Sequence, residues 1–338
     1  MSNDRELGWV RTGGTPREIG QALGRAGRDA VHRHLLPSAP WAEITDARHA
    51  ARVARLAEAT RALYPTAFAE IEGLAEGLGL PFEQVMAWNA RGDLRASVPD
   101  GCTTVMLPGD APVIAHNEDG LPFFRGSSFI AEVAPEGAPG FRCFCYPGSI
   151  PGHTLAWTDS GLVQTVNNIR LTGVVPEVPR MAIGRALLAL ETLVSAEGFL
   201  GGAPASGGFH FALTHRHDRR ILSVEFGGGE TSIREITAPS LHANHALHHA
   251  GGLAAQIVTR SSGDRQAWGE VLVAEGRQPL AILRDTGGPG LPIRRDGPDD
   301  PDHENTLGTA LFTVKDSVIE WRIHDNATGA AAYAGTSA

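Results

Sequence analysis

Two stretches decide the fold of this chain: residues 100–105, with the sequence DGCTTV, and residues 113–120, with the sequence VIAHNEDG. A Pro-Gly-Asp turn at residues 108–110 separates them, so the pattern predicts a β-hairpin. The hairpin would begin at Cys102 and end at the acidic pair 118–119. Antiparallel pairing would bring these ends together, which would place a nucleophile and carboxylates in one small volume.

Cys102 admits two interpretations. A lone intracellular cysteine most often packs as a small buried hydrophobe. Alternatively, cleavage of the bond between Gly101 and Cys102 would give Cys102 a free α-amine. Such an amine titrates near neutrality and can act as the base for its own thiol. Gly101 has no Cβ, so this peptide can adopt the strained dihedrals that attack on its carbonyl requires.

The Gly-Cys-Thr-Thr junction and a series of other motifs resemble the isopenicillin N acyltransferase family of autoproteolytic N-terminal-nucleophile (Ntn) hydrolases. The matching segments run along nearly the whole chain: residues 13–20 with Gly24, 117–119, 146–148, 151–152, 161–162, 167–168, 242–245 and 261–265. Single motifs are weak, but their order and spacing together are fairly specific. Glu118 stands where many members have Trp, which is closer to the branch that contains carcinine hydrolase and β-alanyl-dopamine hydrolase.

The order of predicted elements is α+β rather than a regular βαβ alternation. The resemblance implies a four-layer α-β-β-α sandwich, the Ntn-hydrolase fold. It also implies two parts: residues 1–101 as a helical pro-segment, which becomes the small chain after cleavage, and residues 102–338 as the catalytic core. We expect the two fragments to stay associated, and a homo-oligomer is compatible with this plan.

Local patterns predict the individual elements. Thr15, followed by Pro16 and by Glu18, is typical of a helix start. Three further helices are predicted before the junction, at 41–64, 65–80 and 81–91. After the junction the pattern predicts helices at 181–196 and 265–275, and strands at 128–133, 141–146, 154–157, 162–167, 209–214, 221–226, 231–236, 307–314 and 318–323.

The catalytic candidates are Cys102 as nucleophile, Asp119 as the group that orients Cys102 and its amine, and two asparagines. Asn167 and Asn244 lie where the family places functional asparagines, which the resemblance implies are oxyanion stabilisers. An amide N–H directed at a developing oxyanion contributes about 3 kcal/mol. Asparagine at a strand end is also common turn chemistry.

Four residues are candidates for substrate binding. Glu118 alternates to the opposite strand face from Asp119 and is predicted to bind a cationic part of the substrate; the alternative is a solvent-facing acid. Arg265 occupies the family's Ser-Ser-x-x-Arg position and would bind a carboxylate or buttress the nucleophile. His245 and Arg294 complete the set, although arginines on loops are usually just solvated.

Metal and cofactor sites are not expected. The histidine-rich stretch 242–249 lacks the His-Glu-x-x-His spacing and an internal acidic residue. Cys143 and Cys145 would share one strand face, and core packing explains them better than a metal pair. No Gly-x-Gly-x-x-Gly follows a predicted strand, so a nucleotide fold is not indicated.

The composition excludes several classes of function. The chain has 338 residues and a net charge of −9, with no Lys/Arg-rich run, so nucleic-acid binding is not expected. No apolar run approaches the roughly 20 residues that span a bilayer. Three cysteines and a polar N-terminus make the cytoplasm the expected location.

The sequence therefore predicts a cofactor-free amidohydrolase that acts on a small N-acyl amide, of the β-alanyl type, through a thioester on Cys102. One alternative is an acyltransferase that passes the acyl group to an amine. A second is an unprocessed cysteine hydrolase with His116 or His245 as its base. A third is a catalytically silent binding protein on the same scaffold.

Overall fold

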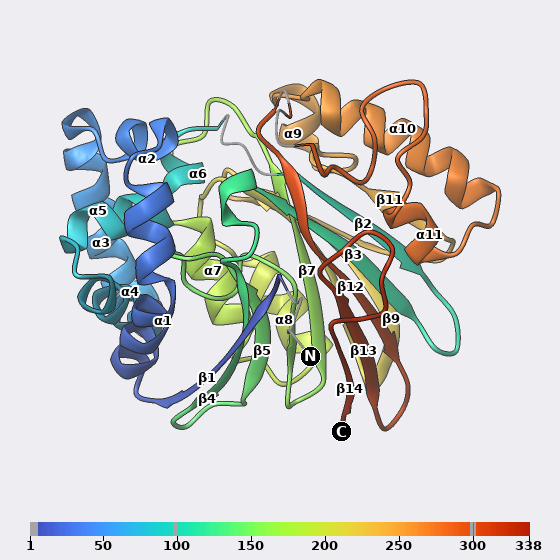
Figure 1. Cartoon of the computed structure of the whole chain (residues 1–338), viewed down its shortest axis with the longest axis horizontal. Helices are drawn as coiled ribbons and strands as arrows, with labels where there is room; N and C mark the ends of the chain where they lie inside the picture. The colour runs from blue at the N-terminus through green and yellow to red at the C-terminus, as the bar shows by residue number, and fades with distance from the viewer. Residues whose placement is uncertain (1–5, 97–100, 298–299, 301) are drawn as a thin grey trace.

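Two β-sheets stack at the centre of the molecule, and helices cover both outer faces (Figure 1). The computed structural model describes residues 6–96, 101–297, 300 and 302–338. Helices of the N-terminal part, together with α7 (Arg180–Leu187) and α8 (Leu193–Gly201), lie against one sheet. Helices α10 (Arg260–Ala274) and α11 (Pro279–Leu283) lie against the other. The predicted α+β, four-layer α-β-β-α order is confirmed.

The first sheet, sheet A, has eight strands. In spatial order they are β1 (Gly8–Gly14), β4 (Phe129–Pro135), β5 (Phe141–Cys145), β6 (Ala156–Thr158), β7 (Leu162–Ile169), β8 (Gly208–His215), β9 (Asp218–Gly227) and β10 (Glu230–Glu235). All neighbours are antiparallel except β1 and β4. The predicted antiparallel meander from residue 128 to residue 167 is therefore confirmed.

The second sheet, sheet B, has six strands. In spatial order they are β11 (Ser240–His242), β2 (Cys102–Leu107), β3 (Val113–Gly120), β12 (Asn305–Val314), β13 (Ile319–His324) and β14 (Tyr333–Ser337). The predicted hairpin is β2 and β3, and it occupies the middle of the sheet. Its position explains why both strands are almost entirely buried.

The N-terminal part is mostly helical, with α1 (Pro16–Ala30), a π-helical turn (Val31–Leu35), α2 (Ala39–Ile44), α3 (Ala50–Leu63), α4 (Pro65–Leu78), α5 (Phe82–Asn89) and α6 (Arg91–Leu94). The predicted start of α1 is confirmed: Thr15 and Glu18 form a reciprocal capping box. This part also contributes β1, which pairs in parallel with β4, so it is not wholly helical as predicted. Cleavage at the junction would therefore leave a strand of one fragment paired at the edge of the other fragment's sheet.

Two predicted helices are interrupted. The stretch 181–196 divides into α7 and α8, because Thr192 caps a new helix through the backbone N–H of Ser195. The stretch 41–64 divides at Asp46, whose carboxylate accepts a hydrogen bond from Arg48 N and starts a short 3-10 turn (Ala47–His49). The spacing of apolar residues continues across both breaks, so this spacing alone predicted uninterrupted helices.

Two short segments remain: a 3-10 turn at Pro122–Phe124 and the helix α9 (Ala250–Ala254).

A buried ion pair joins the N-terminal part to the core. Arg185 of α7 donates to both carboxylate oxygens of Glu70 in α4, with N–O distances of 2.6–2.9 Å. Neither side chain is accessible, so each needs the other to remain charged in the interior.

Helices α1 and α4 cross backbone to backbone through glycines. A Cβ on Gly20 would lie 2.1 Å from Glu70 O, and a Cβ on Gly73 would lie 2.0 Å from Arg17 O. Both distances are far below van der Waals contact with rigid backbone atoms. The two helices can approach this closely only because these positions lack side chains.

Gly73→Ala should therefore lower the free energy of unfolding, by about 1–3 kcal/mol, because the added methyl group forces the helices apart. The matched control is Gly198→Ala in α8, where a Cβ meets nothing within 4 Å. That change should be neutral or stabilising by up to about 1 kcal/mol through helix propensity. Urea unfolding followed by circular dichroism measures both. Equal effects of the two changes would contradict the proposed close crossing.

Candidate active site

The register of β2 and β3 positions the thiol. Cys102 pairs with Glu118, and Thr104 pairs with His116. Directly opposite residues of an antiparallel pair point to the same face, so these four side chains share one face of the hairpin. That face is directed at sheet A, because Thr104 Oγ1 hydrogen-bonds Asn167 of β7 at 2.7 Å.

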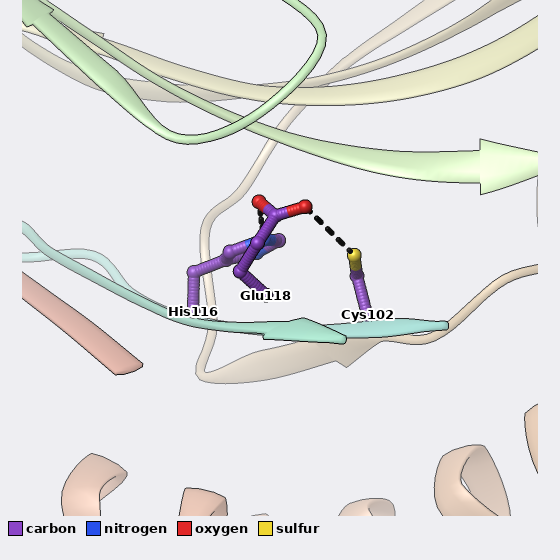
Figure 2. A group of neighbouring side chains, drawn as sticks. All are labelled: Cys102, His116 and Glu118. Atoms are coloured by element: carbon purple, nitrogen blue, oxygen red, sulfur yellow. Dashed lines mark hydrogen bonds and ion pairs between the residues drawn. The ribbon is translucent and has the colours of Figure 1, made fainter. Parts of the chain in front are cut away.

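Figure 2 shows that Glu118 lies between the thiol and the imidazole. Cys102 Sγ is 3.8 Å from Glu118 Oε1, and His116 Nε2 is 3.3 Å from Glu118 Oε2. The hydroxyl of Tyr146 donates to Glu118 Oε1 at 2.9 Å. All four side chains are buried. A carboxyl group rather than a histidine is thus the nearer proton acceptor for the thiol.

The donor atoms of Cys102, His116 and Glu118 all lie within 4.8 Å of one another, which is close enough to hold a metal ion. The sequence pattern did not reveal this grouping, because its members become neighbours only through strand pairing. A metal bound there would use the thiol as a ligand and so remove it as a nucleophile.

Two side chains hold the backbone of Cys102. Asn244 Oδ1 accepts a hydrogen bond from Cys102 N at 2.8 Å. Arg265 donates to Cys102 O at 2.5 Å, to Thr103 Oγ1 at 2.8 Å and to Asn244 Oδ1 at 2.6 Å. These bonds use the oxygen of the Asn244 amide. Its Nδ2 is buried and has no hydrogen-bond partner among the described residues, so it remains available as a donor.

Asp119 lies on the other face of β3 from Glu118, and so on the opposite side from the thiol. Its backbone N–H donates to Gly101 O at 3.0 Å. Burial raises the pKa of Asp119 to about 7, while Arg265 and the hydroxyl of Thr306 act in the opposite direction. The structure places Asp119 beside the carbonyl of the junction rather than beside the sulfur.

The junction itself faces an acidic residue that the sequence did not single out. A Cβ on Gly101 would lie 2.4 Å from Glu304 Oε2, so the carboxylate fills the space a side chain would need. Glu304 is buried and accepts from Arg295 at 2.8 Å and from Ser261 at 3.2 Å. A side chain before Cys102 would have to displace this carboxylate from its partners.

Asn167 does not reach the thiol. Its Oδ1 accepts from Thr104 at 2.7 Å and lies 3.0 Å from His210 Nδ1, and its Nδ2 donates to His242 O at 3.2 Å. The Asn167 amide thus hydrogen-bonds between the two sheets, and Asn167 does not line the pocket beside the thiol. Asn244 contacts Cys102 directly and is the better placed of the two predicted stabilisers.

The other predicted substrate-binding residues lie away from the thiol. His245 Nδ1 is 2.8 Å from Ser262 Oγ, and Arg294 pairs with Asp296 at 2.8 Å. Arg265 is committed to the backbone and side chains around Cys102, which fits the buttressing role rather than the carboxylate-binding role. Glu118 is the one predicted substrate-binding residue that the structure brings to the thiol.

A small pocket lies beside the thiol. Its lining residues are Arg91, Cys102, Glu118, Tyr146, His153, Val166, Asn168, Arg180, Met181 and Phe209. Tyr146 belongs to a segment that matches the family motifs, so the sequence offered a signal for it. Most of the others come from separate elements, and their convergence depends on the tertiary packing.

Within the described ranges, no helix is both long enough and apolar enough to cross a membrane.

Comparisons with known proteins give three similarities. A family described as acyl-coenzyme A:6-aminopenicillanic acid acyl-transferase matches residues 106–328. The beta-alanyl-dopamine/carcinine hydrolase of Drosophila melanogaster is 25% identical over 214 residues, which cover 55% of this chain and 54% of the relative. The chain thus spans about half the length of that relative.

The third similarity is to a solved structure, the Caenorhabditis elegans N-acylethanolamine-hydrolyzing acid amidase (NAAA) ortholog. It has a TM-score of 0.46 and 9% sequence identity, and the match covers 62% of this chain and 92% of that chain. The family match begins at residue 106, after Cys102, so it does not include the junction.

The raised pKa of Asp119 predicts how stability changes with pH. The folded state holds the proton up to about pH 7, whereas an unfolded Asp releases it near pH 4. The contribution of Asp119 to the free energy of unfolding is fully present below pH 4. It is lost as pH rises through 7, because the unfolded state binds fewer protons than the folded state in that window. Urea unfolding of wild type and Asp119→Asn between pH 4 and 8 should show the variant gaining stability relative to wild type. A difference in the free energy of unfolding between the two proteins that does not change with pH would contradict the raised pKa.

Proposed function

We propose a function from one premise: the chain belongs to the acyl-coenzyme A:6-aminopenicillanic acid acyl-transferase family, whose match covers more than half of its length. Membership makes it an enzyme of the amide hydrolase or acyltransferase class. Within that class we propose an amide hydrolase whose nucleophile is the thiol of Cys102. The enzyme would become active when the chain cleaves itself between Gly101 and Cys102, and the two fragments would stay associated.

The arrangement of Cys102 is the observation that carries this proposal. The thiol faces a pocket, while Asn244 and Arg265 hold the nitrogen and the carbonyl of the same residue. After cleavage the nitrogen would be a free α-amine in the same position. A base and a nucleophile would then belong to one residue, with a free amide donor next to them.

The proposed reaction has two stages. The Cys102 thiol gives its proton to the α-amine, and the thiolate attacks the carbonyl carbon of the substrate amide. Asn244 Nδ2 donates to the oxyanion, and the amide C–N bond then breaks as the leaving amine takes the proton from the α-ammonium. Water attacks the thioester, which releases the acid and restores the thiol. An amine in place of water would give acyl transfer.

The pocket and one relative suggest which substrates to test first. Glu118 places a carboxyl beside the thiol, which suits a cationic acyl group such as β-alanyl. A relative is named for β-alanyl-dopamine and carcinine. Arg91 and Arg180 also line the pocket, so N-acyl groups that end in a carboxylate are the informative contrast. We propose β-alanyl amides as the preferred class, tested by amine release across both sets.

Denaturing mass spectrometry of freshly purified protein should show two fragments that meet between Gly101 and Cys102. Cys102→Ala should stay intact, because the nucleophile for cleavage is missing. Cys143→Ala is a matched control, since it removes another buried thiol, and it should still be cleaved. A full-length wild type that is fully active would show that self-cleavage is not required.

Asn244→Ala should lower kcat by about a hundredfold or more, which is the usual effect of losing one oxyanion donor. The measurement uses steady-state amine release, normalised to the cleaved fraction, because Asn244 also holds Cys102 N. Asn326→Ala, in a loop away from the pocket, is the control and should match wild type. A cleaved Asn244→Ala protein with near-normal kcat would place the oxyanion donors elsewhere, on backbone N–H groups.

A further inference from the structure

Before cleavage, Cys102 has no α-amine. Its nitrogen belongs to a peptide bond and donates to Asn244 Oδ1 at 2.8 Å, so it cannot accept the thiol proton. The base that serves later turnover therefore does not exist when the chain cuts itself. If self-cleavage occurs as proposed above, another group must take that first proton.

The amide of Asn167 has one orientation. Its Nδ2 must face His242 O, since a carbonyl oxygen can only accept. Asn167 Oδ1 therefore faces Thr104 Oγ1 at 2.7 Å and His210 Nδ1 at 3.0 Å. Because Oδ1 can only accept as well, the hydroxyl of Thr104 must point its proton at Asn167.

This orientation fixes the tautomer of His116. The proton of Thr104 is used on Asn167, so Thr104 Oγ1 can offer His116 only a lone pair. His116 Nδ1 lies 2.8 Å from that oxygen and must therefore carry a proton. The remaining nitrogen, Nε2, faces Glu118 Oε2 at 3.3 Å. One further proton is shared across that contact, because two lone pairs would repel each other.

The contacts of Glu118 give its two oxygens different surroundings. The hydroxyl of Tyr146 lies 2.9 Å from Oε1 and 3.1 Å from Asp119 O, and the backbone N–H of Leu155 donates to Oε2 at 3.4 Å. His116 Nε2 and Leu155 N therefore hold Oε2, while Oε1 is directed at Cys102 Sγ at 3.8 Å.

We propose that Glu118 is the base for the self-cleavage step and that His116 is its positioning residue. Glu118 Oε1 takes the proton from Cys102 Sγ, and the thiolate attacks the carbonyl carbon of Gly101. When the bond between that carbon and Cys102 N breaks, the nitrogen takes the proton from Glu118. Water then hydrolyses the thioester, which leaves the Gly101 carboxylate and a free Cys102 thiol and amine.

Other polar groups that line the pocket are less suited to this role. Arg91 and Arg180 carry no basic lone pair, and Tyr146 already donates to Glu118. The imidazole of His153 lines the same pocket, with Nδ1 against Ile150 O at 2.9 Å. Burial holds the pKa of His153 well below its usual value, so it is a weak base. His153→Gln is therefore the comparison that separates the two candidates.

The test follows cleavage of the full chain after synthesis in vitro, with the 102–338 fragment quantified by mass spectrometry. At pH 7, Glu118→Gln should slow cleavage by about a hundredfold or more, the usual range for loss of a general base. Raising the pH from 7 to 8 should speed cleavage of this variant about tenfold, because hydroxide replaces the base and an ordinary thiol ionises near pH 8.5. A purely structural role would give no such rescue.

Three further variants complete the test. Glu118→Asp keeps a carboxylate and should cleave faster than Glu118→Gln, so the proposal stays testable if the glutamine variant does not fold. His153→Gln and the exposed control Glu136→Gln should cleave like wild type. Wild-type cleavage by Glu118→Gln, or loss of cleavage in His153→Gln alone, would overturn the role of Glu118 and leave self-cleavage intact. A wild type that never cleaves would overturn both.

Discussion

The register between β2 and β3 is the constraint on which the rest of the site depends. Each face of this hairpin packs into its own apolar cluster. Val105 and Ala115 pack against Leu241 and residues of α10 and α11, whereas Met106 and Ile114 pack against sheet A. A shift of one residue would exchange these faces and turn the thiol away from Glu118. The packing of ordinary apolar side chains therefore fixes the pairing of Cys102 with an acid.

The same alternation separates two kinds of chemistry. On the thiol face, Glu118 contacts His116, and the hydroxyl of Thr104 links His116 to the amide of Asn167. On the junction side, Glu304 is held by Arg295, and Arg265 grips the backbone of Cys102. Buried charges are costly unless they are paired, so each side carries its own counter-charges. The strand thus separates the carboxyl nearest the thiol from the groups that hold the backbone of Cys102.

Local sequence patterns were sufficient to predict much of the fold. The hairpin, the capping box at Thr15 and the antiparallel meander each depend on neighbours in the sequence, and the structure has all three. The α7–α8 break was missed because the apolar period continues through it, while the cap at Thr192 depends on a single hydroxyl. The layer order came from the family resemblance rather than from the pattern itself.

The candidate site was only partly accessible from sequence. Alternation placed Glu118 and Asp119 on opposite faces, but which of them faces Cys102 depends on how many residues the turn between the strands takes up. The family motifs brought Asn244 and Arg265 into consideration. Nothing in the sequence indicated Glu304, which reaches the junction from a distant strand start by tertiary packing. Side chains that meet across layers leave no periodic signal.

Cleavage of the junction would change the charges of a buried site. It would create an ammonium at Cys102 N and a carboxylate at Gly101. The ammonium would favour the ionised form of Asp119, whose pKa in the uncut chain is raised to about 7 by burial. The new carboxylate would form next to the carboxylate of Glu304, which already fills the space beside Gly101. Glu304 is already paired with Arg295 and Arg170. The new carboxylate would therefore compete with Glu304 for these cations, because a buried charge is costly unless it is paired. The close contact between Gly101 and Glu304 thus links cleavage of the junction to the ion pairs beside it.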